Sequence, residues 1–162
     1  MYQPTNQPTN CQEFKMFKKS IFAAALVSVS LVTGCASVPM ASKEEDAALK
    51  QFSKPTEDKA GLYIYRDSSV GQALKKNVYV DGNLVGETAN KVYFYKEVAP
   101  GKHKISTESE FSDNDASFNA EGGQNYFAEQ YIKMGLFVGG AGVKMVSESE
   151  GKSAVKECEL AK

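Results

Sequence analysis

The order of apolar and polar positions separates one continuous apolar run near the N-terminus from many short apolar segments after residue 60. These segments are rich in β-branched and aromatic residues, and glycine, proline or asparagine lies between them, which is typical of strands joined by tight turns. Turn residues recur about every 8 to 12 positions, a spacing that indicates a β-sandwich. The predicted strands cover residues 61–66, 77–80, 92–98, 103–110, 111–120, 125–134 and 143–146.

Two capping boxes predict short helices on either side of the strands. In each, a serine at the N-cap is followed three positions later by a glutamate, so that each side chain can bond the other's backbone N–H. The pairs are Ser42 with Glu45 and Ser147 with Glu150. Gly151 weakens the second helix because glycine has a low helix propensity. The sequence therefore predicts a mainly β fold, a small antiparallel β-sandwich with short helices near its N-terminus and C-terminus.

The apolar run belongs to a segment, residues 16–35, with the features of a bacterial lipoprotein signal peptide. Lys18 and Lys19 form a positive n-region, an apolar stretch follows, and small residues precede Cys35 as in a lipobox. The alternative is a transmembrane helix, but a helix that spans a bilayer needs about 20 apolar residues. The run is shorter, so the sequence predicts cleavage before Cys35 and lipidation of that residue.

The signal peptide divides the chain into four parts. Residues 1–15 are polar and precede the n-region, which indicates a misplaced start codon; a functional extension is the alternative. Residues 16–34 form the signal peptide, residues 35–59 a tether with a short helix, and residues 60–162 the β-sandwich domain. The mature chain of 128 residues is long enough for one domain with its own core.

The charge of the mature chain limits its partners. Loss of residues 1–34 removes three lysines and one glutamate and leaves a net charge of about −3. A mildly acidic chain lacks the positive surface that binds nucleic acids or anionic lipids, so we expect no nucleic-acid partner. We expect attachment to the membrane through N-terminal acyl chains. The absence of aspartate at Ala36 and Ser37 favours the outer membrane, with the domain facing the periplasm.

Five runs stand out from residue 59 to the C-terminus: KAGLYIYR, VYVDG, VYFYKEVAPGKH, NYFAEQYIKMG and EGK. In this order they resemble a family of uncharacterised bacterial lipoproteins that is known only as a domain of unknown function. The part from VYVDG to PGKH is also similar to the PEGA-type pattern. The resemblance implies an immunoglobulin-like or prealbumin-like β-sandwich and a location in the cell envelope. It implies no activity and no catalytic residues.

Few side chains of the mature chain offer chemistry. Once Cys35 carries lipid, Cys158 is the remaining thiol, and His103 is the sole histidine. A lone cysteine among apolar neighbours usually packs as a small buried residue. The acidic positions of 108–115 lack the spacing of a calcium loop, and EGKS at 150–153 lacks the upstream glycine of a phosphate-binding loop. We therefore expect no catalytic residue, no metal site and no cofactor.

Four tyrosines are the best candidates for a functional surface. Tyr63 and Tyr65 alternate with aliphatic residues on one predicted strand, and Tyr93 and Tyr95 do so on another. If the aliphatic faces form the core, the tyrosines share the outer face of a sheet. Such a stripe could stack on a sugar or bind a protein partner. The alternative is cross-strand tyrosine pairing that only stabilises the sheet.

A glycine-rich stretch, residues 135–142, is predicted to be a loop beside these tyrosines. Gly139 and Gly140 complete the candidate partner surface, because glycines let a ligand or a membrane approach the backbone closely. The alternative is a mobile connection between two strands.

These features favour a non-enzymatic cell-envelope lipoprotein, anchored at Cys35, whose sandwich acts as an interaction or structural module. The expected partners are the membrane and an envelope protein or peptidoglycan. The alternative is a hydrolase or another enzyme that acts on cell-envelope material. Such an enzyme would need a pocket that joins His103 to a carboxylate and a hydroxyl.

Overall fold

The computed structural model describes residues 37–108, 114–133 and 139–162. The predicted extension, the signal peptide and Cys35 lie outside the described residues. So do the end of the predicted strand 103–110, the start of the predicted strand 111–120 and part of the glycine-rich stretch.

Two β-sheets and two short helices make up the described part of the chain. Each predicted strand has a counterpart, and the structure adds β3 and the two-residue β9, which the pattern did not indicate as strands. In chain order the elements are α1 Lys43–Leu49, β1 Ala60–Arg66, β2 Lys76–Val80, β3 Asn83–Thr88, β4 Val92–Val98, β5 Gly101–Thr107, β6 Asp115–Ala120, β7 Asn125–Lys133, β8 Gly140–Val146, α2 Glu148–Lys156 and β9 Glu159–Leu160.

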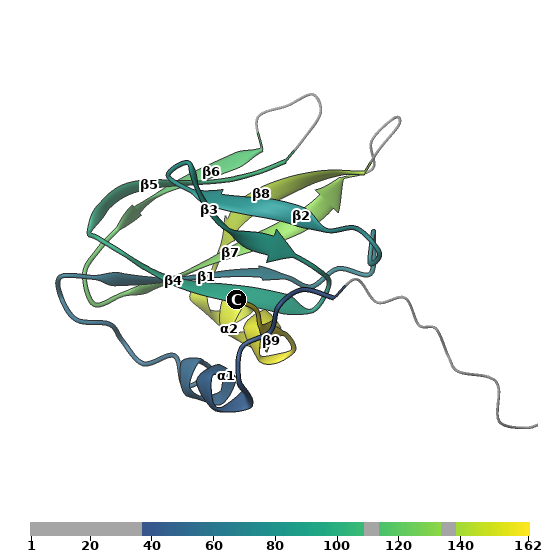
Figure 1. The fold of residues 1–162 in the computed structure, drawn as a ribbon. Coiled ribbons are helices and arrows are strands. Elements are labelled where there is room, and N and C mark those ends of the chain that lie inside the picture. Colours follow the sequence, from purple (N-terminus) through teal and green to yellow (C-terminus); the bar gives the residue numbers. More distant parts are fainter. Residues whose placement is uncertain (1–36, 109–113, 134–138) are drawn as a thin grey trace, which may run out of the picture. The chain divides into compact units, whose positions relative to one another are not determined.

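The elements stack in three layers (Figure 1). A four-stranded sheet in the order β3-β2-β5-β6 faces a five-stranded sheet in the order β8-β7-β1-β4-β9, and α1 and α2 lie on the outer face of the second sheet. The prediction of a small β-sandwich with short helices is confirmed. Two strand pairs are parallel rather than antiparallel, β1 with β7 and β4 with β9. In each pair several other elements separate the two strands in the chain, which gives enough length for a crossover instead of a hairpin.

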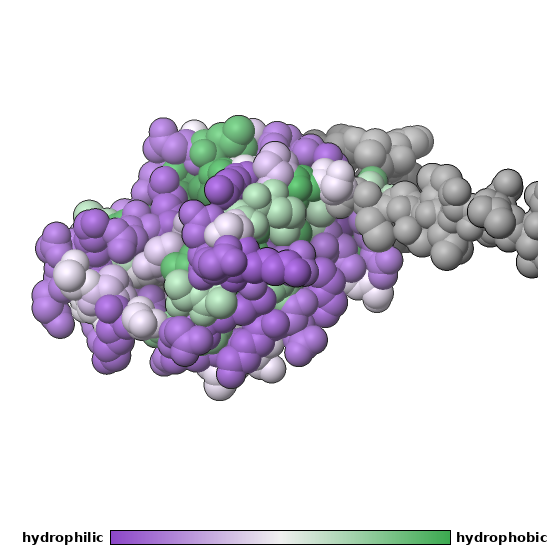
Figure 2. Space-filling view, turned by 60° about the horizontal axis from the view of Figure 1, so that its bottom comes forward, coloured by the Kyte–Doolittle hydropathy of each residue, from purple (hydrophilic) through white to green (hydrophobic). Residues whose placement is uncertain are grey.

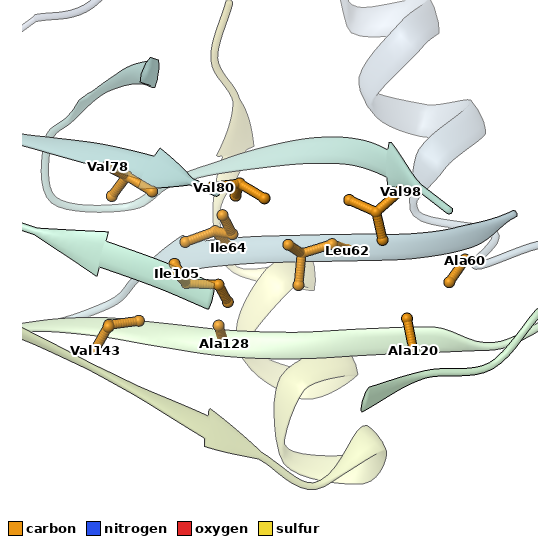
Figure 3. Close-up of a cluster of buried hydrophobic side chains, with 10 residues drawn as sticks. All are labelled: Ala60, Leu62, Ile64, Val78, Val80, Val98, Ile105, Ala120, Ala128 and Val143. Carbon is orange, nitrogen blue, oxygen red and sulfur yellow. The ribbon is translucent and has the colours of Figure 1, made fainter. Parts of the chain in front are cut away.

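The core between the two sheets is aliphatic (Figure 3). Leu62 and Ile64 point into it from β1, Val78 and Val80 from β2, and Ile105 from β5, and each is at most 1% exposed. Each of them alternates along its strand with a residue that faces the other way, which is the period of two that the sequence shows. Full burial of one such side chain contributes about 1.5–3 kcal/mol, so this layer contributes strongly to stability.

A second, aromatic core lies between the five-stranded sheet and the helices. Phe52 follows α1 in the chain, and its ring centroid lies 5.4 Å from that of Tyr63 and 5.9 Å from that of Phe127. Val155 enters the same cluster from α2 and is fully buried. Helix α1 itself contributes no buried residue. The outer face of the sheet is therefore covered mainly by Phe52, α2 and the C-terminal segment.

The chain is packed against the sandwich from Val38 onward, which corrects the prediction that the segment before α1 is a tether. Val38 is 8% exposed and clusters with Val92 and Ala161 at the edge of the sandwich. Met40 forms an isolated β-bridge with Ala161. The sequence did not indicate this packing because two apolar residues among small ones make no periodic pattern.

The turn and cap predictions are confirmed. Asp81 and Gly82 form the β2–β3 turn with φ values of 51° and 81°, the two positive angles that a tight hairpin turn requires. The Ser42 hydroxyl accepts from the Glu45 backbone N–H at 3.1 Å, and the Glu45 carboxylate accepts from the Ser42 N–H at 3.0 Å. The Ser147 hydroxyl accepts from the Glu150 backbone N–H at 3.3 Å and caps α2, but the return bond from the Ser147 N–H to the Glu150 carboxylate is absent, so the second predicted capping box is only half formed.

Candidate functional site

The structure places most of the predicted tyrosine surface inside the molecule. Tyr63, Tyr65 and Tyr93 are 1%, 2% and 0% exposed, whereas Tyr95 is partly accessible. The register of β1 with β4 does bring Tyr63 opposite Tyr95 and Tyr65 opposite Tyr93, so the tyrosines share one face as predicted. That face is the one that the helices cover. A docking surface built from all four tyrosines is therefore contradicted.

Tyr63 and Tyr93 hold α1 against the sheet. The Tyr63 hydroxyl donates to the Leu49 carbonyl at 2.9 Å, and the Tyr93 hydroxyl donates to the Asp46 carbonyl at 3.4 Å. The Tyr63 ring stacks on Phe127 with the centroids 5.0 Å apart. Burial raises the pKa of Tyr63 and of Tyr93 well above the usual range, so both hydroxyls stay protonated donors. These two side chains therefore stabilise the packing of the sheet, in line with the alternative interpretation of the tyrosines.

Gly139 and Gly140 also belong to the packed part of the fold. Gly140 begins β8 and pairs with Lys133 of β7. A Cβ on Gly139 would lie 2.6 Å from a Leu74 methyl group, so this glycine allows the chain after β1 to pack closely. The predicted loop therefore overlaps the start of β8. Its remaining part, residues 135–138, lies outside the described residues.

Tyr65 borders an acidic groove between α2 and the five-stranded sheet, with a volume of about 400 Å³. The register of β1 with β7 places Tyr65 beside Glu129. Burial, followed by the negative charges of Glu129 and Glu150, raises the pKa of Tyr65 and keeps its hydroxyl protonated. The groove is lined by Tyr65, Asp67, Glu129, Glu150, Ser153, Ala154 and Glu157.

The helix-bearing side of the molecule is mostly hydrophilic, with small and separate apolar patches (Figure 2). One shallow hollow of about 410 Å³ lies between α1 and the C-terminal segment. Tyr95 lines it together with Leu49 and Leu160. Tyr95 is thus the member of the predicted surface that borders an apolar hollow, and no broad tyrosine stripe accompanies it.

His103 lines a second groove, about 480 Å³ in volume, beside the β2–β3 turn. Its Nδ1 lies 2.6 Å from the Asp81 carboxylate, and its Nε2 lies 2.7 Å from the Ala99 carbonyl oxygen. Both partners are acceptors, so the doubly protonated ring satisfies both contacts. Burial lowers the pKa of His103, but the hydrogen bonds to Asp81 and Ala99 and the charge of Asp81 outweigh it and raise the pKa above its usual value.

This groove contains a histidine, a carboxylate and a hydroxyl, but they do not form a catalytic triad. A serine nucleophile needs a free ring nitrogen to take its proton. The Nε2 of His103 contacts Ala99 instead. Ser117 of β6 pairs with Lys104, the residue after His103, so Ser117 and His103 project from opposite faces of the sheet. The pair of His103 and Asp81 ties two neighbouring turns together.

Two buried polar side chains were not predicted from the sequence. Arg66 is fully buried, and its guanidinium donates to the carbonyls of Leu74, at 2.7 Å, and of Gly71. Burial lowers the pKa of Arg66. Gln130 is also fully buried and contacts the Thr88 hydroxyl of the facing sheet. Arg66 follows Leu62 and Ile64 at the alternate positions of β1 that face the core. A charged residue at such a position is the sequence feature that could have indicated its burial.

Cys158 is buried and chemically quiet. It is 1% exposed, and its Sγ lies 3.8 Å from the Arg66 carbonyl oxygen. Burial raises the pKa of Cys158 to about 12, so the thiol stays protonated at neutral pH. The interpretation of Cys158 as a small packed residue agrees with this position.

The described residues contain no group of three or more histidine, cysteine, aspartate or glutamate side chains placed to hold a metal ion. Neither of the helices in this part of the chain is long and apolar enough to cross a membrane.

Comparison with known proteins places the chain in a family. Residues 56–141 match the family described as "Protein of unknown function (DUF2846)". An uncharacterized protein of Haemophilus influenzae is 52% identical over 147 residues, which cover 90% of this chain and 88% of the relative. No solved structure matches the chain. The matched region runs from the segment before β1 to the start of β8, and α2 follows it. The chain belongs to the DUF2846 family, as the resemblance to a bacterial domain of unknown function predicted.

Proposed function

We propose that this protein is a non-enzymatic cell-envelope lipoprotein, anchored by acyl chains on Cys35, whose β-sandwich serves as a periplasmic interaction or structural module. The observation that carries the proposal is the sequence of residues 16–35: two lysines, a short apolar run, and small residues before a cysteine. Ala36 and Ser37 follow that cysteine and favour the outer membrane.

The start of the packed domain supports an anchor at this cysteine. Val38 is the first described residue that is buried, and it follows Cys35 by three positions. Three residues span at most about 11 Å. Acyl chains on Cys35 would therefore hold the sandwich directly at the membrane surface rather than on a long linker.

The bonding of the few reactive groups supports a non-enzymatic role. Both ring nitrogens of His103 are engaged, and the thiol of Cys158 is buried and protonated. The pair of His103 and Asp81 is the observation that favours the alternative, an enzyme acting on cell-envelope material. The contact of Nε2 with Ala99 weakens it, because that nitrogen would have to accept a proton.

The anchor is tested by Cys35→Ser in cells that express the full chain. We expect the variant to accumulate as a longer, unlipidated precursor, whereas the native protein is shortened, takes up a clickable fatty acid and fractionates with the outer membrane. Cys11→Ser is the matched control, because Cys11 precedes the signal peptide and its loss should change nothing. If Cys35→Ser is processed and labelled like the native protein, the lipoprotein proposal is wrong.

The partner is sought by crosslinking the lipidated protein in intact cells, which assumes nothing about the partner's identity. An envelope protein or peptidoglycan fragment recovered with the native protein would support an interaction module. Turnover of envelope material that His103→Gln abolishes would favour the enzyme.

A further inference from the structure

The acidic groove beside Tyr65 combines residues from distant parts of the chain. Strand β1 supplies Tyr65 and is followed by Asp67, and β7 supplies Glu129. Helix α2 supplies Glu150 on the opposite wall, and its C-cap residue is Glu157. These two glutamates are seven positions apart, near the two ends of α2, and both line the groove.

The groove has four carboxylates, of which two form ion pairs with lysines. Asp67 and Glu129 form ion pairs with lysines, at 2.6 Å and 2.8 Å. Glu150 and Glu157 have no ion-pair partner among residues 37–108, 114–133 and 139–162. Lys144 and Lys91 act on Glu150 and Glu157 only through longer-range attraction, so the groove keeps a net negative charge, which favours a cation over an anion.

Tyr65 supplies a second and independent indication of a ligand. The residue is 2% exposed and lines the groove, and its hydroxyl, which still reaches solvent, has no hydrogen-bond partner within the described part of the chain. The hydroxyl of a tyrosine whose ring is buried usually finds a partner, so this one is available to a ligand in the groove. The protonated hydroxyl still offers oxygen lone pairs, so it can accept a hydrogen bond from an N–H group in the groove.

The distribution of the carboxylates fits an organic cation better than a metal ion. The described residues include no metal-binding group of three, and Glu150 and Glu157 lie near opposite ends of α2. We propose that this groove binds a lysine ammonium or arginine guanidinium group of a protein partner, with Tyr65 accepting one hydrogen bond and Glu150 or Glu157 the others. Charge-assisted hydrogen bonds of this kind are directional and strong for their size.

This inference rests on the proposed role as an interaction module and adds the chemistry of the partner. It does not depend on the anchor at Cys35. Failure of lipidation at Cys35 and failure of cation binding in the groove can therefore be told apart.

The test is a titration of the full-length ¹⁵N-labelled protein, in a non-ionic detergent, with tri-lysine amide and with tri-glutamine amide as the uncharged comparison. We expect tri-lysine to give saturable shifts at the amides of Tyr65, Glu129 and Ser153, with a dissociation constant on the order of 1 mM. Tri-glutamine should give none. Absence of saturable shifts at these amides, or shifts spread evenly over all acidic surfaces, would overturn the proposal.

Matched variants decide whether the groove itself is responsible. Glu150→Gln with Glu157→Gln should weaken tri-lysine binding by about tenfold, as expected from the loss of two partly exposed ion pairs. Tyr65→Phe keeps the packed ring, and loss of its one hydrogen bond should weaken binding about threefold. Glu44→Gln with Glu121→Gln removes the same charge from exposed positions outside the groove that form no ion pair in the described part of the chain, and it should leave the dissociation constant unchanged. Equal weakening by both double variants would overturn the proposal.

Discussion

Asp81 and His103 join two turns that are 22 positions apart in the sequence. Asp81 adopts a φ of 51° in the hairpin turn, and its carboxylate also accepts from the Lys104 N–H at 2.9 Å. Burial raises the pKa of Asp81, but the hydrogen bonds from His103 and Lys104 outweigh it and lower the pKa below its usual value. At the scale of single residues, each partner stabilises the charged form of the other.

We predict that this pair stabilises the fold most between about pH 4 and pH 6.5. The folded pKa of His103 is raised, so its contribution is complete below the unfolded value of about 6.5 and is lost as pH rises through the folded pKa. The folded pKa of Asp81 is lowered, so its contribution is complete above about 3.9 and is lost as pH falls through the folded pKa. In urea denaturation, His103→Gln should reduce the free energy of unfolding by about 0.5–1 kcal/mol more at about pH 5.5 than at about pH 8.5.

Lys59→Gln is the control for this experiment. Lys59 pairs with Glu97 at 2.6 Å on the surface, and its pKa is raised above the usual lysine value, chiefly by the hydrogen bond to Glu97. The lysine stays charged at both pH values, so the effect of its loss should be the same at each. Equal effects of His103→Gln at the two pH values would contradict the predicted pH dependence.

At the scale of elements, α2 approaches β7 closely because one of its inner positions has no side chain. A Cβ on Gly151 would lie 2.3 Å from the Cβ and Cγ atoms of Phe127. The Cβ and Cγ atoms are the side-chain atoms nearest the backbone, so they cannot move aside unless β7 moves as well. Gly151, which weakens the helix by propensity alone, therefore lets α2 cover the aromatic core.

Gly151→Ala should destabilise the protein, although alanine is the better helix former. Overpacking of a close contact costs about 1–3 kcal/mol, which exceeds the gain of about 1 kcal/mol in helix propensity. We expect the melting temperature to fall by several degrees in thermal unfolding followed by circular dichroism. Ser149→Ala, at an exposed position of the same helix, should be neutral or slightly stabilising. A rise in melting temperature for Gly151→Ala would show that the close contact does not exist.

At the scale of the whole molecule, the N-terminal segment joins one end of the sandwich. Val38 packs with Ala89 and Val92. Asn90 lies in the turn between Ala89 and Val92, and its side-chain oxygen accepts a hydrogen bond from the Ser68 N–H, in the segment after β1, at 3.0 Å. Strands β2 and β3 lead from this end to the hairpin turn at the other (Figure 1). An anchor three residues before Val38 would thus turn the first end toward the membrane.

We predict that, in lipid vesicles, a spin label on Val70→Cys lies nearer the bilayer than one on Leu84→Cys. Both residues are exposed, at 46% and 59%, and Val70 follows β1 whereas Leu84 adjoins the hairpin turn. The strand residues between the two ends correspond to about 13 Å or more. Relaxation by nickel on lipid headgroups should therefore be stronger for the label at position 70. Cys158 is buried and should stay unlabelled. Equal relaxation at the two positions would contradict this orientation.

The sequence by itself determined the local elements of this protein. Ser42 and Ser147 mark the two helix starts, and Asp81 with Gly82 marks the hairpin, because caps and tight turns depend on contacts within about four residues. Alternation along the strands assigned Leu62 and neighbouring aliphatic residues to the core between the sheets, and the family resemblance followed from the same runs. A period of two is a property of the backbone, so it can be read without knowing what packs against each face.

Only the tertiary structure decided what covers each face. Both sides of β1 carry apolar rings or chains, and the sequence does not state that Phe52 and α2 bury Tyr63 and Tyr65. The acidic groove likewise exists only because α2 packs across strands that precede it by about 20 to 90 positions. Burial is a property of segments brought together in space, and no pattern within a few residues of a tyrosine records which distant segment will lie upon it.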